Sequence, residues 1–133
     1  MPSKLGNTEQ AAFAIANELD DAADAIRTRS KQAYAAGRMR LEEYMEARAR
    51  ELELRTELSV IVATDLGAVL EAASEAGENI EQAIRAAKAR IEAVRSVESG
   101  LKIVASLVSL AGALASGDLE LVMKVAKAVA DVA

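Results

Sequence analysis

The sequence predicts an all-α fold, a single-domain antiparallel bundle of four to five helices, and three observations support this prediction. The chain has 133 residues, the size of one ordinary domain, with one proline and 2% aromatic residues. Alanine, leucine, glutamate and arginine, all strong helix formers, dominate the composition. Apolar residues recur at intervals of three and four, which is the period of an amphipathic helix.

Two helices are expected in the first 76 residues. The first covers residues 7–36 and carries an apolar stripe that includes Ile15 and Leu19, with Asn7 as its N-cap and Gly37 just beyond its end. A second, long helix covers residues 38–76, and its pattern is compatible with a kink near residues 64–67. Its first half is densely charged. Residues 58–63 are apolar on nearly every side, so we expect them to be buried.

Three further helices are expected over residues 79–98, 101–115 and 118–132. The first of them carries an isoleucine stripe at Ile80, Ile84 and Ile91, with charged residues on its other faces. Ser99 and Gly100 form the predicted break before the next helix. A turn at residues 116–118 then precedes the last helix, so residues 101–132 form a helical hairpin.

This C-terminal hairpin, residues 101–132, is strongly apolar and allows three interpretations. It can form the core of the bundle, an interface with a partner or a second copy, or a hairpin that inserts into a membrane. Each predicted helix has about 15 residues, fewer than the ~20 that span a bilayer, which favours the core. The last helix also has one narrow polar line, formed by Glu120, Lys124, Lys127 and Asp131.

The composition argues against most catalytic and metal chemistry. Without cysteine or histidine the chain lacks thiolate ligands and the commonest general base, so we expect no enzyme activity, no metal and no cofactor. The segment Asp20–Asp24 resembles the Asp-Asp-x-x-Asp motif with which isoprenoid synthases hold Mg²⁺. Its helical spacing points the carboxylates away from the core, however, and no second such motif occurs. We therefore expect a solvated acidic face.

A basic island interrupts this acidic protein between residues 27 and 40, where five cations occur with no carboxylate. One interpretation is local, because cations near a helix C-terminus and pairing of Arg38 and Arg40 with Glu42 and Glu43 explain it. The other is docking of an acidic partner or of an anionic surface. A net charge of −5 and few aromatic residues argue against nucleic acid. The candidate partner surface is Arg27, Arg29, Lys31, Arg38, Arg40 and Arg48.

These features predict a non-enzymatic helical module that binds a protein partner or self-associates, in the manner of an adaptor, an immunity protein or a chaperone. The alternative is a membrane-active protein that inserts its 101–132 hairpin. We expect no small-molecule ligand. The first residues lack the apolar run of a signal peptide, which predicts a cytoplasmic location unless a secretion system without a cleaved signal is used.

Overall fold

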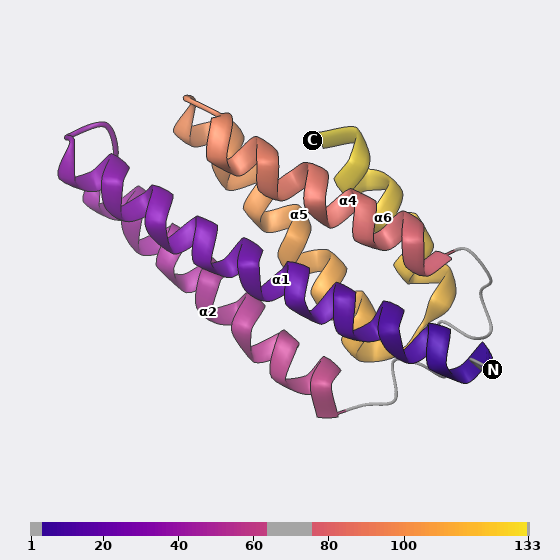
Figure 1. Cartoon of the computed structure of the whole chain (residues 1–133). Coiled ribbons are helices and arrows are strands. Elements are labelled where there is room, and N and C mark those ends of the chain that lie inside the picture. The colour runs from indigo at the N-terminus through magenta and orange to yellow at the C-terminus, as the bar shows by residue number, and fades with distance from the viewer. Residues whose placement is uncertain (1–3, 64–75, 133) are drawn as a thin grey trace.

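The computed structural model describes residues 4–63 and 76–132, and every regular element within these ranges is an α-helix (Figure 1). The predicted all-α class is therefore confirmed. The helices are α1 (Lys4–Ala35), α2 (Leu41–Ala63), α4 (Ala76–Ala93), α5 (Val97–Ser116) and α6 (Leu119–Val132).

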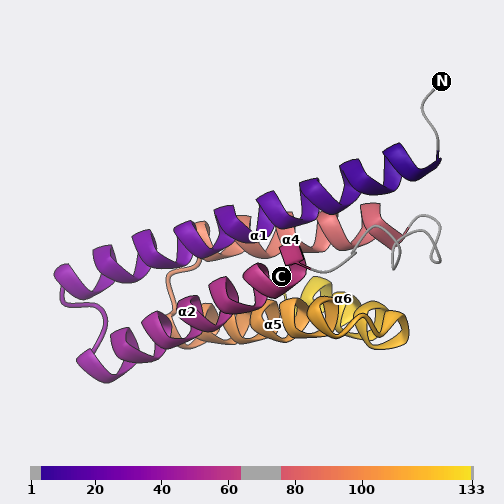
Figure 2. The same ribbon diagram turned by 90° about the horizontal axis from the view of Figure 1, so that it is seen from below.

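The helices pack around α1 and α5. α1 contacts both α2 and α4, while α5 contacts α2, α4 and α6. Figures 1 and 2 show α1, α2, α4 and α5 side by side along much of their lengths, with the shorter α6 against α4 and α5. One long face of α2 is consequently turned away from the other helices.

The core follows the apolar stripes that the sequence predicts on the first helix and on the isoleucine-rich helix. Ile15 and Leu19 of α1 and Ile80 and Ile84 of α4 are fully buried. α5 supplies the largest share of the core, because its apolar side chains meet three neighbouring helices. Its buried residues are Ile103, Val104, Leu107, Leu110, Ala111, Ala113 and Leu114.

Two glycines end helices in the left-handed conformation that side chains disfavour. Gly37 has a φ of 73°, which allows its N–H to donate to Tyr34 O and the next N–H, that of Arg38, to donate to Ala33 O at 2.9 Å. Gly117, with a φ of 75°, ends α5 in the same conformation. Both helix ends agree with the sequence prediction.

The predicted break at Ser99 and Gly100 is wrong. α4 ends at Ala93, and α5 begins at Val97 with Ser96 as its N-cap, whose side chain accepts a hydrogen bond from the Ser99 N–H. Satisfying a free donor in the first turn of a helix in this way stabilises an early start. α5 therefore has 20 residues instead of the predicted 15. At the other end of the chain, Asn7 is not an N-cap, because α1 begins at Lys4.

The predicted burial of residues 58–63 is only partly correct. Ile61 is buried and Leu58 is half-buried, but Val60 and Val62 are exposed. The physical reason is that α2 is covered by α1 and α5 on one side only. α2 begins at Leu41, three residues later than predicted, and α4 begins at Ala76, three residues earlier. The predicted kink near residues 64–67 lies outside the described residues, and so does the continuity of the 38–76 helix.

Candidate interaction surfaces

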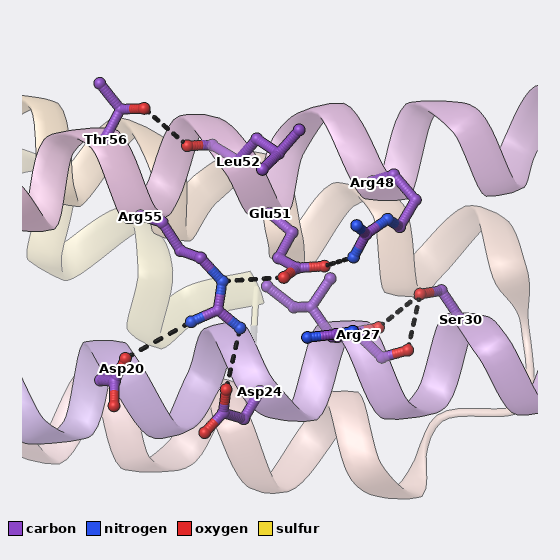
Figure 3. Close-up of polar contacts among 10 residues, drawn as sticks. Asp20, Asp24, Arg27, Ser30, Arg48, Glu51, Leu52, Arg55 and Thr56 are labelled. Carbon is purple, nitrogen blue, oxygen red and sulfur yellow. Dashed lines mark hydrogen bonds and ion pairs between the residues drawn. The ribbon is translucent and has the colours of Figure 1, made fainter.

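An ion-pair network anchors α2 to α1 (Figure 3). At its centre is Glu51, which is only 2% exposed. Its Oε1 accepts a hydrogen bond from Arg48 Nη1 at 2.6 Å, and its Oε2 accepts one from Arg55 Nε at 2.8 Å. Arg55 also donates to Asp24 Oδ1 at 2.8 Å and to Asp20 Oδ1 at 3.5 Å. These bonds to Asp24 and Glu51 raise the pKa of Arg55 above its ordinary value.

The three aspartates of α1 are exposed, as predicted, and their carboxylate oxygens lie within 4.8 Å of one another. Each has a basic partner on a neighbouring helix. Asp20 and Asp24 bind Arg55, and Asp21 lies 3.7 Å from Lys88. Because each carboxylate already has a cationic partner on a neighbouring helix, the cluster is explained as the means by which α1 binds α2 and α4.

Three of the six predicted partner residues have internal roles. Arg48 neutralises Glu51, as described above. Arg29 of α1 donates from Nη2 to Val94 O at 3.1 Å, just beyond the end of the neighbouring helix α4. Arg40 pairs with Glu43 at 3.4 Å, the local pairing that the sequence suggests. Arg29 and Arg48 therefore hold parts of the fold together, whereas the pair of Arg40 with Glu43 is local and Arg40 is largely exposed.

The other three residues, Arg27, Lys31 and Arg38, are exposed, and none has an ion pair among the residues that the structure describes. They lie near the loop between α1 and α2. At this end of the bundle Tyr34 of α1 stacks on Tyr44 of α2, with 4.7 Å between the ring centroids. The stack fixes the start of α2 beside the end of α1, and so holds the basic island in place.

An apolar cavity of about 70 Å³, here called the end cavity, lies at the same end of the bundle. Its walls come from the end of α1, the α1–α2 loop, one residue of α2 (Ala47), the end of α4, the α4–α5 link and the first turns of α5. Three of its lining residues are charged, and all three are arginines: Arg29, Arg38 and Arg95. No carboxylate lines the cavity within the described part of the chain. Two residues of the predicted basic island thus line a cavity together with Arg95.

A row of exposed apolar side chains follows the outer face of α2 and is here called the outer row. Leu41, Met45 and Leu52 are 56%, 62% and 55% exposed. Their spacing of four and seven residues places them within an arc of about 40° on the helix. Ala47 and Leu54, which are buried, occupy the opposite face. Figure 3 shows Leu52 on the side of α2 that points away from α1.

Carboxylates flank the outer row on both sides. Four glutamates follow one edge, and among them only Glu53 has an arginine partner, Arg50, at 3.2 Å. The other edge is the Glu51 network, in which the carboxylates of Glu51, Asp20 and Asp24 outnumber the two arginines, Arg48 and Arg55. The surroundings of the row therefore carry an excess of four negative charges. The edge glutamates are Glu42, Glu46, Glu53 and Glu57.

The sequence predicts the i,i+4 pair of Glu51 and Arg55, which is confirmed at 2.8 Å, but it did not reveal the outer row, the burial of Glu51 or the place of Arg95. The row has a sequence signal, because Leu41, Met45 and Leu52 share one helical face opposite the core positions. Glu51 also has a signal, since arginines three residues before and four residues after it can pair with its carboxylate. Arg95 has none, because its place beside the basic island depends on how α4 packs against α1.

Comparison with protein-family models, with curated proteins and with solved structures finds no match to this chain.

Proposed function

We propose that this protein is a non-enzymatic interaction module whose outer row binds an amphipathic helix with basic flanks from a partner protein. The observation that carries the proposal is the exposure of Leu41, Met45 and Leu52 on a single face of α2. Large apolar side chains that gather in one patch, instead of lying scattered, are typical of protein-binding surfaces.

The charges around the outer row support a basic partner. With seven carboxylates and three arginines along its edges, the surface attracts cations during encounter and disfavours an acidic helix. The same pattern disfavours a second copy of the chain, because pairing two such faces brings like charges together. Many proteins bind an amphipathic helix in this way, by contacting apolar side chains that recur at helical spacing on the bound helix.

A binding assay with a synthetic helix tests this proposal. The probe is an amphipathic peptide of leucine and lysine, as long as α2, and the same design with glutamate in place of lysine serves as its counterpart. We expect Leu52→Glu to weaken binding of the lysine peptide at least about tenfold, because it removes a central apolar anchor. This loss is diagnostic, since the added negative charge alone would attract the peptide.

Leu121→Glu is the matched control, because it makes the same change at an exposed leucine of α6, a helix that packs on α4 and α5. It should leave the affinity within about twofold of the unmodified protein. Equal affinity for the glutamate peptide, or an equal loss in both variants, would overturn the proposal. A dimer that Leu52→Glu dissociates would overturn it as well, because a second copy would then occupy the row.

A second candidate function is membrane insertion, which one observation favours. α5 has 20 residues and is long and apolar enough to cross a bilayer, and 39% of its most apolar window is buried inside the protein. Flotation with phosphatidylglycerol-containing vesicles at neutral and acidic pH tests it. Protection of α5 from proteolysis in the vesicle-bound protein would support insertion. If the protein floats with the vesicles at neither pH, insertion is excluded.

A further inference from the structure

The end cavity combines an apolar interior with a rim that carries only positive side-chain charge. Its apolar lining is contributed by α1, α4, the α4–α5 link and α5, through residues such as Ile26, Ala33, Ile91, Val94 and Leu101. A cavity of this kind can bury a hydrocarbon chain, because enclosing it removes apolar surface from water on both sides.

The positive charges of the rim come from three separate parts of the chain. Arg29 is held at the cavity by its bond to Val94 O, which fixes its guanidinium without neutralising its charge. Arg38 and Arg95 have no carboxylate partner among the described residues and remain available to an anion. The first turn of α5 also lines the cavity at Val97, and a helix N-terminus attracts negative charge.

The size of the cavity limits the ligand. A buried water occupies roughly 10–15 Å³ of cavity volume, and a methylene group is of similar size. A cavity of about 70 Å³ therefore has room for about five methylene groups. A short aliphatic chain fits this space, with its charged end at the arginines. Longer chains and aromatic ring systems would project from the cavity into solvent.

We propose that the end cavity binds a short-chain aliphatic carboxylate, with the hydrocarbon inside the bundle and the carboxylate at Arg38 and Arg95. This site is separate from the outer row and does not depend on the proposed function. It departs from the sequence-based expectation of no small-molecule ligand, because that expectation lacked Arg95 and the cavity.

Titration with hexanoate, followed by NMR of ¹³C-labelled methionine methyl groups, tests the proposal. Met39 lines the cavity, whereas Met45 lies on the outer row and Met123 is exposed on α6. Hexanoate should shift the Met39 methyl signal saturably and leave the Met45 and Met123 signals unchanged. Hexylamine, which has the same chain and the opposite charge, should bind at least about tenfold more weakly.

Three variants locate the site. Ala33→Leu fills the cavity without changing any charge, and the pair Arg38→Gln, Arg95→Gln removes two rim charges. Each should weaken hexanoate binding about tenfold or more. The pair Arg27→Gln, Lys31→Gln is the matched control, because it removes two charges of the same island that do not line the cavity.

Thermal unfolding of each variant establishes that it folds, so that loss of binding reports on the cavity. The control pair should keep the affinity within about twofold of the parent. Absence of a saturable Met39 shift would overturn the proposal. Equal binding of hexylamine, or an equal loss of affinity in the control pair, would also overturn it, since recognition would then not depend on the rim arginines.

Discussion

Replacing Arg55 with methionine should destabilise the protein markedly, although the residue lies at the edge of the bundle. Arg55 makes one bond to the buried Glu51 at 2.8 Å and two to the exposed Asp20 and Asp24. A hydrogen bond to a buried charged group contributes roughly 1.5–3 kcal/mol, and exposed ion pairs contribute about 0.2–1 kcal/mol. Arg48 still neutralises Glu51 in the variant, which keeps the loss below that of an unpaired buried charge.

We therefore expect Arg55→Met to lower the free energy of unfolding by about 2–3 kcal/mol, which corresponds to a fall in Tm of roughly 6–12 °C for a chain of this size. Urea titration followed by circular dichroism measures it. Arg50→Met is the matched control, because Arg50 pairs only with the exposed Glu53, and its loss should cost less than about 0.5 kcal/mol. Equal effects of the two substitutions would refute the role assigned to the Glu51 network.

Three further predictions concern the helices and their ends, and the same unfolding measurement checks each of them. Gly37→Ala should cost about 1–2 kcal/mol, because φ is 73° there, whereas Gly112→Ala, inside α5 with open space around the added methyl group, should stabilise by about 0.5–1 kcal/mol. The same sign for both would contradict this account of the helix end. Ser96→Ala should cost about 1 kcal/mol, because it removes the N-cap of α5, and no change would mean that α5 does not depend on that bond. Leu107→Ala should cost about 3 kcal/mol or more at a fully buried site, while Leu121→Ala, at an exposed one, should cost less than about 1 kcal/mol. Equal losses of unfolding free energy in the two variants would contradict the placement of Leu107 in the core.

Several features that depend on local sequence were predicted correctly, with the start of α5 as an exception. The stripes that bury Ile15, Leu19, Ile80 and Ile84 follow from helical spacing alone. The end at Gly37 follows from the need for a residue that tolerates positive φ. The start of α5 was missed because Ser99 and Gly100 resemble a break, whereas the cap comes from Ser96, three residues earlier.

Features that depend on packing between helices could not be predicted in the same way. Val60 and Val62 lie in an apolar run, yet they are exposed, because coverage of α2 depends on where its neighbours lie. The end cavity draws Arg38 and Arg95 from segments that are distant in sequence. The sequence locates the charges of the basic island. It does not distinguish side chains that bind within the protein, such as Arg29, from those that remain available to a ligand.

The most direct test of the proposed interaction surface is the methionine methyl spectrum during titration with the leucine–lysine helix. Met45 lies on the outer row and Met123 on α6, and both side chains are exposed, so each reports on its own surface. Binding along α2 predicts a saturable shift of the Met45 signal and an unchanged Met123 signal. An unchanged Met45 signal, or equal shifts at both methionines, would contradict the assignment of the outer row as the docking surface.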